Sequence, residues 1–148
     1  MRLPAFIIAA AVVLLAGCET TQSTPSFSRV YRGTQPDVFD AAQHVLYDMN
    51  YRKFEGDPTT GKLTASTVVD SIATTTRWNT ADVQLHTRGD QQIEVSILFS
   101  YHSSDLQGPA SAAAKRVPFG ANDGSYSAFF ELLATALGQP TPAKSTGK

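Results

Sequence analysis

Between positions 93 and 101, apolar residues recur at every second position, and this pattern constrains the fold more than any other in the chain. The apolar members are Ile93, Val95, Ile97, Phe99 and Tyr101. Successive side chains of a β-strand point to opposite faces, so a period of two gathers these residues on one face. One buried and one solvated face are typical of an antiparallel sheet that is covered on one side.

Shorter runs of the same period predict further strands. Val83 and Leu85 alternate with polar residues just before the first run, and Arg-Gly-Asp at 88–90 predicts a hairpin turn between the two. The segment 57–61 is rich in Pro, Gly and Thr and predicts another turn. The remaining expected strands are 27–32, 51–55 and 63–69.

Two helices are predicted from apolar residues that recur at a period of 3.6. The first has its apolar face on Val38, Ala41, Ala42, Val45, Leu46 and Met49. Thr34 and Asp37 form an N-cap arrangement before it, with Pro36 in the first turn, and Asn50 suits its end. The second has its apolar face on Tyr126, Phe129, Phe130, Leu133 and Leu137, and ends at Gly138.

The element order is therefore β-α-β-β-β-β-α, and the expected fold class is α+β. We expect a two-layer sandwich in which an antiparallel sheet of four to five strands carries both helices on one face. The folded domain spans 27–137. Residues 18–26 have the small, polar composition of a flexible tether, and 138–148 have that of a disordered tail.

The chain begins with one positive residue, Arg2, and an almost wholly apolar stretch at 3–16. As a helix this stretch spans about 20 Å at roughly 1.5 Å per residue, less than the ~30 Å hydrocarbon core of a membrane. Its length suits the apolar region of a secretory signal peptide. We therefore interpret residues 1–17 as a signal peptide.

The sequence Leu15-Ala16-Gly17-Cys18, which ends this stretch, resembles the lipobox of bacterial lipoproteins. The resemblance implies cleavage between Gly17 and Cys18, and acyl chains such as palmitate on Cys18, the first residue of the mature protein. Two or three chains hold a protein stably at a membrane, because each buried CH₂ contributes about 0.8 kcal/mol. Cys18 is the single cysteine, so the domain is expected to have no disulfide.

Glu19 stands where, in enteric-type bacteria, an Asp tends to retain lipoproteins in the inner membrane. The resemblance therefore implies the inner leaflet of the outer membrane, facing the periplasm. The domain itself, with its terminal Tyr-x-x-Phe-Phe helix at 126–130, is similar to small proteobacterial lipoproteins. It also resembles the helix-grip domains in the C lipoprotein of the β-barrel assembly machinery. The shared residues are core and turn residues, so this likeness concerns the fold rather than an activity.

The charge distribution argues against nucleic acid as a partner. The chain has 12 Lys and Arg against 13 Asp and Glu, a formal net charge of −1. These charges are evenly mixed along the chain, whereas a nucleic-acid-binding domain carries a clustered basic face. We therefore expect no nucleic-acid partner.

Residues 56–62 match the Gly-x-x-x-x-Gly-Lys part of a phosphate-binding loop, but the neighbouring residues exclude that function. Leu63 stands where a Ser or Thr must bind Mg²⁺. Pro58 removes a backbone N–H from a loop that works through such groups, and a strand rather than a helix follows. The segment is predicted to be a turn between two strands.

The sequence offers no ligand set for a metal and no catalytic group with its partner. His44 and His86 fall on separate expected elements, and the hairpin at 88–90 pairs His86 with about 92–94, away from His102. The serines have no positioned base, and no carboxylates are paired. We expect no enzyme activity, no metal and no cofactor.

Two regions are candidate binding surfaces. Residues 71–80 form a polar stretch with Arg77 and Trp78, the only tryptophan, and Trp and Arg are enriched at interface hot spots. The alternative for Trp78 is that it caps an edge of the core. The long connection 103–123, with Lys115 and Arg116, is the second region, because connections of this length in compact domains are often functional.

The sequence therefore favours a non-enzymatic, lipid-anchored envelope protein that binds another envelope protein as an accessory or assembly factor. Its expected partners are the membrane, through acyl chains on Cys18, and an unidentified envelope protein. The alternative is a module that binds a lipid or small apolar molecule between sheet and helices. That space looks filled by Phe39, Phe99, Tyr101, Phe129 and Phe130.

Overall fold

The computed structural model describes residues 27–72, 75–105, 115–120 and 122–143, and within them the chain has an α+β fold. The described part contains seven strands and two helices. In chain order these are β1 (Phe27–Arg32), α1 (Gln35–Asp48), β2 (Lys53–Asp57), β3 (Lys62–Ser66), β4 (Asp70–Ile72), β5 (Thr75–Gly89), β6 (Gln92–Asp105), β7 (Lys115–Pro118) and α2 (Gly124–Ala136).

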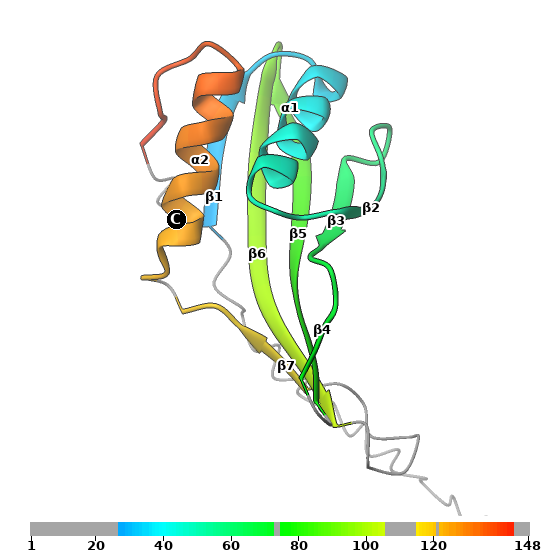
Figure 1. Ribbon diagram of the computed structural model, residues 1–148. Helices are drawn as coiled ribbons and strands as arrows, with labels where there is room; N and C mark the ends of the chain where they lie inside the picture. The colour runs from blue at the N-terminus through cyan, green and yellow to red at the C-terminus, as the bar shows by residue number, and fades with distance from the viewer. Residues whose placement is uncertain (1–26, 73–74, 106–114, 121, 144–148) are drawn as a thin grey trace, which may run out of the picture.

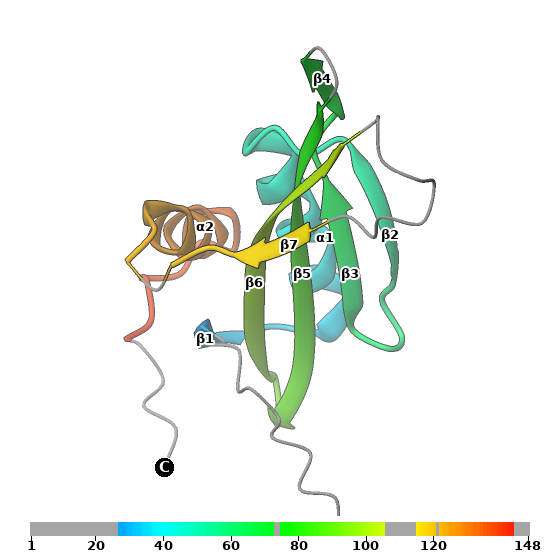
Figure 2. The ribbon, with the colours of Figure 1, turned by 90° about the horizontal axis from the view of Figure 1, so that it is seen from below.

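The seven strands form one antiparallel sheet, and both helices lie on the same face of it. Along the sheet the strands follow the order β1-β6-β5-β3-β2 (Figure 2), with β4 paired to β5 and β7 paired to β6. Figure 1 shows α1 and α2 in front of this sheet. The predicted α+β sandwich, with an antiparallel sheet and two helices on one face, is confirmed.

The core lies between the sheet and the helices, on the face that the period-two pattern predicts. Every second residue from 81 to 85 in β5 and from 93 to 99 in β6 is buried there, and none of these is more than a few per cent exposed. They are Ala81, Val83, Leu85, Ile93, Val95, Ile97 and Phe99. From the helices, Leu46, Phe129 and Leu133 are fully buried against them. Burial of such side chains supplies most of the stability of a domain of this size.

Both helices begin at the N-cap residue that suits them. The Thr34 hydroxyl accepts the Asp37 N–H and donates to the Asp37 carboxylate at 2.6 Å, which satisfies a backbone donor that a helix start leaves free. The Asp123 side chain accepts the Ser125 N–H at 2.8 Å in front of α2. After α1, Asn50 has a φ of 73°, a left-handed conformation in which Asn is enriched.

The predicted strand count of four to five is wrong, because β4 and β7 were not expected. Two further expectations change with them. The strand expected around Val83 begins at Thr75, so much of the polar stretch 71–80 is strand. The connection 103–123 holds the end of β6 and all of β7. Within this connection, residues 106–114 lie outside the described residues, and Lys115 begins β7.

The extra strands exist because β5 and β6 continue past the helices. Beyond β3, the edge of β5 pairs with β4, and beyond β1, the edge of β6 pairs with β7. We call this region, made of 70–72, 75–80, 100–105 and 115–118, the arm (Figure 1). Neither face of the arm is covered by a helix, and apart from Tyr101, which ends the run that starts at Ile93, its residues carry no period-two pattern. Hydrophobic periodicity therefore does not predict the strands of the arm.

The segment 57–61 is the predicted turn between two strands. The Asp57 carboxylate accepts bonds from the N–H and hydroxyl of Thr59, at 2.8 and 2.7 Å, and the Thr59 hydroxyl bond is the main cause that lowers the pKa of Asp57. The Gly61 N–H then donates to the Asp57 carbonyl at 3.0 Å. Gln35, at the start of α1, donates to the Pro58 carbonyl at 2.7 Å and ties the helix to this turn.

Gly61→Ala is expected to lower the free energy of unfolding by about 3 kcal/mol, because backbone strain and a clash add together. Gly61 has a φ of +68°, and a Cβ there would lie 2.6 Å from the Leu85 carbonyl oxygen. Gly138→Ala is the matched control, since Gly138 has a φ of +63° but open space around it. Urea unfolding of both variants measures the difference. Equal losses would show that the contact with Leu85 contributes nothing.

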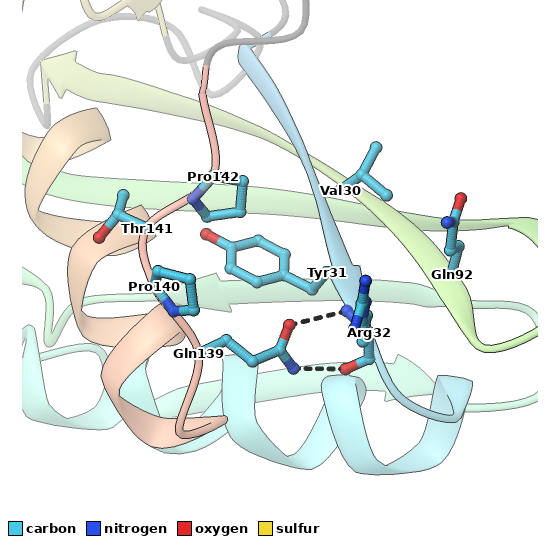
Figure 3. Close-up of a pocket in the computed structure, with 8 residues that line it drawn as sticks. All are labelled: Val30, Tyr31, Arg32, Gln92, Gln139, Pro140, Thr141 and Pro142. Carbon is cyan, nitrogen blue, oxygen red and sulfur yellow. Dashed lines mark hydrogen bonds between the residues drawn. The ribbon is translucent and has the colours of Figure 1, made fainter.

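The chain after α2 runs along β1 rather than away from the domain. The Gln139 carboxamide accepts the Arg32 N–H at 2.8 Å and donates to the Arg32 carbonyl at 2.5 Å, as a neighbouring strand would (Figure 3). Pro140, Thr141 and Pro142 follow it beside Tyr31, around a surface cavity of about 430 Å³. Residues 139–142 of the expected tail therefore lie beside β1, and 144–148 lie outside the described residues.

Candidate functional site

The arm brings three side chains from three strands into one row on the outer face of the sheet, the face away from the helices. In the strand register, Trp78 of β5 lies opposite His102 of β6, and His102 lies opposite Arg116 of β7. Directly paired residues of neighbouring strands point to the same face. We call Trp78, His102 and Arg116 the outer-face row.

The first two members of the row stack on each other. The rings of Trp78 and His102 are nearly parallel, with centroids 5.1 Å apart and an interplanar angle of 10°. The His102 ring is also fixed by a 2.9 Å hydrogen bond between its Nε2 atom and the Thr80 hydroxyl. Both rings are half-buried. The row thus holds a large aromatic side chain in a defined orientation while leaving part of it accessible.

Arg116 is held at the other end of the row by two partners. Its Nε donates to the hydroxyl of Ser100, a fully buried residue, at 3.0 Å. One of its terminal nitrogens forms an ion pair with Asp82 at 2.5 Å. Asp82 also accepts a hydrogen bond from the Thr64 hydroxyl at 3.0 Å. This chain of contacts extends from β7 to β3, so the outer-face row continues into a polar network across the sheet.

The imidazole of His102 favours the neutral form. Burial of the ring is the main cause that holds the pKa of His102 below its ordinary value of 6.5, and the Arg116 charge acts in the same direction. Asp82 acts in the opposite direction and is the smaller influence. A neutral ring between Trp78 and Arg116 avoids a like-charge contact with the guanidinium, which suits a surface that works near neutral pH.

The four residues that the sequence proposed for partner binding do not share one face of the arm. They are Arg77, Trp78, Lys115 and Arg116. Trp78 and Arg116 belong to the same row on the outer face. Arg77 is exposed and, by strand alternation, lies on the opposite face of the arm. Its register partner in β6 is Ser103, which also pairs with Lys115 of β7. Trp78 therefore lies on the arm and outside the main core, stacked on His102 rather than capping a core edge.

A shallow groove of about 190 Å³ borders Trp78 on the side of β3 and β2. Hydroxyl and charged side chains line it, including Lys53, Glu55, Thr64 and Thr80. His102 lies on the β6 side of Trp78 and stacks on its ring, so the indole is bordered by an imidazole and by this groove.

The arm also has exposed apolar residues. Val68 and Val69, just before β4, are 67% and 43% exposed, and Val117 of β7 is 43% exposed. These residues lie at the two edges of the arm, beside β4 and in β7. The arm thus combines an aromatic residue, a fixed arginine and exposed valines, the residue types that interfaces use.

The three histidines lie apart, as the sequence indicated. His44 is on α1, His86 pairs with Glu94 near the hairpin turn as predicted, and His102 lies on the arm. Among the described residues, no group of three or more His, Cys, Asp or Glu side chains is placed to hold a metal ion. The arrangement on the arm is suited to binding through stacking, hydrogen bonds and a guanidinium.

Comparisons with known proteins do not assign the chain to a family. No protein-family model matches the sequence, and no curated protein matches it. Among solved structures, the chain is similar to a TBP-like protein from Parabacteroides distasonis. The identity is 13%, the alignment covers 67% of this chain and 70% of that chain, and the TM-score is 0.32. A likeness this distant carries no argument about function.

The proposed acylation site, Cys18, and the cleavage site between Gly17 and Cys18 lie outside the described residues. In the part of the chain that the structure describes, no helix is long and apolar enough to cross a membrane. Phe27, the first described residue, begins β1, so the expected tether at 18–26 leads directly into an edge strand of the sheet.

Sequence reasoning missed the residues that give Trp78 and Arg116 their setting, which are His102, Thr80 and Asp82. Each is unremarkable in its own stretch, and their proximity depends on the cross-strand register. The run of threonines at 74–76 and at 80 was the available signal, because β-branched residues favour strands even where no hydrophobic pattern exists.

Proposed function

We propose that this protein is a lipid-anchored envelope lipoprotein that faces the periplasm and binds another envelope protein through its arm, as a non-enzymatic accessory or assembly module. The observation that carries the proposal is the outer-face row of Trp78, His102 and Arg116. The anchor rests on the resemblance of the Leu15-Ala16-Gly17-Cys18 sequence to a lipobox.

Three features of the arm support protein binding at this place. The indole is oriented by stacking and the guanidinium by two partners, so less side-chain entropy is lost when a partner binds. The arm extends beyond both helices, which leaves room for a partner (Figure 1). Val68 and Val69, just before β4, add exposed apolar surface at the edge of the arm. A few well-packed aromatic and arginine side chains carry most of the energy of typical interfaces.

The alternative module, with a ligand between sheet and helices, finds less support in the core. The aromatic side chains there are packed against one another: Phe99 contacts Tyr126 and Phe129, with ring centroids 5.2 and 6.2 Å away. Phe129 and Phe130 are 5.4 Å apart and almost fully buried. Densely packed aromatic rings leave this region filled by the protein itself.

Trp78→Ala is expected to weaken capture of the partner at least tenfold while the domain stays folded, because a hot-spot tryptophan contributes about 2 kcal/mol or more. A photo-crosslinking residue at Ser104, whose register partner Thr76 lies two positions from Trp78 in β5, reports on capture in living cells. The yield of a defined adduct is then compared between Ser104-labelled protein with and without Trp78→Ala. Arg116→Ala is expected to reduce the same adduct.

His86→Ala is the matched control, since His86 is an exposed residue at the opposite end of β5. Its adduct yield is expected to equal that of the unmodified sequence. Thermal unfolding followed by circular dichroism checks that each variant folds. If Trp78→Ala and Arg116→Ala both give the full adduct yield, the partner does not bind at the outer-face row and the proposed function fails.

A further inference from the structure

The seam between β1 and α2 contains a cavity of about 330 Å³ at the side of the core. Figure 1 shows α2 running beside β1. The cavity lies within the range of about 300–1,000 Å³ that small-molecule sites occupy. Its walls are partly aromatic and partly polar. The residues that line it are Phe27, Arg29, Asn122, Asp123, Tyr126, Ser127 and Phe130.

Arg29 occupies a position in β1 where the strand pattern calls for an apolar residue. Its neighbours at the same face, Phe27 and Tyr31, are buried. The Arg29 guanidinium lies over the Phe130 ring, with its carbon 5.0 Å from the ring centroid. One terminal nitrogen donates to the Ser28 carbonyl at 3.0 Å. The strand thus directs a positive charge toward the helix-covered side of the sheet.

The hydrogen-bonding capacity of Arg29 is not used up by these contacts. Its Nε–H is buried and has no hydrogen-bond partner among the described residues. A guanidinium carries five N–H donors and stays charged at every relevant pH, and a buried donor without a partner costs about 1–3 kcal/mol. Such an isolated group in a native fold calls for a physical explanation.

Two other arginines of the domain each have a carboxylate partner. Arg88 forms an ion pair with Glu94, and Arg116 forms one with Asp82. No such pair is made by Arg29 within the described residues. The carboxylate nearest in the lining, Asp123, is engaged as the N-cap of α2, where it accepts the Ser125 N–H at 2.8 Å.

We propose that this cavity binds the oxyanion group of a small ligand, a carboxylate or a phosphate, and that Arg29 pairs with it. A planar guanidinium matches the two oxygens of such a group. The Asn122 carboxamide and the Ser127 hydroxyl line the same cavity and supply further donors, while Phe27 and Phe130 offer apolar walls to the rest of the ligand. This site goes beyond the proposed function, since it involves no residue of the outer-face row.

The test measures the unfolding midpoint of the purified protein in chloride, acetate, inorganic phosphate and glycerol 3-phosphate at matched ionic strength. A ligand that binds only the folded state raises the midpoint in proportion to the logarithm of its concentration, by several degrees well above its dissociation constant. We expect a rise in at least one oxyanion over chloride. Arg29→Met is expected to abolish this rise.

Arg32→Met is the matched control, because it removes the same charge from the same strand at an exposed residue outside this cavity. It is expected to keep the full oxyanion effect. A rise with acetate identifies a carboxylate ligand, a rise with inorganic phosphate identifies a free phosphate, and a rise with glycerol 3-phosphate alone points to a lipid headgroup. If no oxyanion raises the midpoint of the Arg29 protein above that of Arg29→Met, the site does not exist.

A second measurement, in chloride alone, keeps the inference testable without any ligand. Methionine has a similar length and no donor, so Arg29→Met removes an unpaired buried donor and is expected to be as stable as Arg32→Met or more stable. A clear loss of stability relative to Arg32→Met would mean that the Arg29 charge is already compensated within the protein, which overturns the premise.

Discussion

Phe99→Ala is expected to lower the free energy of unfolding by about 4 kcal/mol, the effect of deleting a buried phenylalanine ring from a packed core. Phe99 is completely buried in β6, and four other aromatic rings surround it. Their centroids lie 5.2 to 6.2 Å from its own; they are Tyr51, Phe119, Tyr126 and Phe129. Tyr51 lies in the connection after α1 and Phe119 in the connection before α2, whereas the other two rings belong to α2. A cavity at Phe99 therefore loosens the whole interface between sheet and helices.

The measurement is chemical denaturation of the variant beside Leu132→Ala. Leu132 lies on α2 but is 41% exposed, so its truncation removes apolar atoms that are already partly in water. Its expected loss is below about 1 kcal/mol, in line with surface substitutions. A similar loss for both variants would mean that the aromatic cluster around Phe99 does not dominate the core.

The parts of the fold that the sequence predicts are those where one face is buried. The helix that starts after Thr34 was located to within a residue or two, because its cap and its period-3.6 pattern agree. The same is true of the run from Ile93 to Phe99, whose every second residue is in the core. Local propensity and burial give the same answer at these places, so pattern alone is sufficient.

The arm escaped prediction because no helix covers either of its faces. Its one fully buried described residue is the polar Ser100, and β4 and β7 have only three and four residues, too few for a period to appear. The candidate site depends on register in addition to strand position. Trp78 and Arg116 were both singled out from composition, but only the pairing of each with His102 shows that they share one face. Arg77, chosen by the same reasoning, lies on the other.

The cavity at the β1–α2 seam escaped for a different reason. Arg29 was read as an ordinary residue of the first strand, and its charge carried no signal because polar residues are frequent in edge strands. Its significance comes from the contact with Phe130, a residue far away in the chain. A sequence pattern describes the neighbours of a residue along its own element, whereas a missing hydrogen-bond partner is defined only in three dimensions.

Cys18→Ser is expected to abolish acylation completely, so that incorporation of labelled palmitate falls to background. The reasoning follows the proposed lipobox: only a thiol at this position accepts the diacylglycerol, and Cys18 is the single cysteine of the chain. Because the lipobox resemblance implies that the acylated cysteine becomes the first residue of the mature protein, the variant is also expected to keep residues 1–17. Mass spectrometry of the intact protein measures both effects together.

The control Thr21→Ala lies in the expected tether and is predicted to be acylated and cleaved like the unmodified chain. If Cys18→Ser loses residues 1–17 and the control carries no acyl mass, the segment is an ordinary signal peptide and the anchor is wrong.

The proposed anchor also limits where a partner is found. From Cys18 to Phe27 the chain spans at most about 30 Å when fully extended. Under the proposed anchor, β1 therefore stays close to the leaflet, and the arm reaches partners that come near that membrane surface.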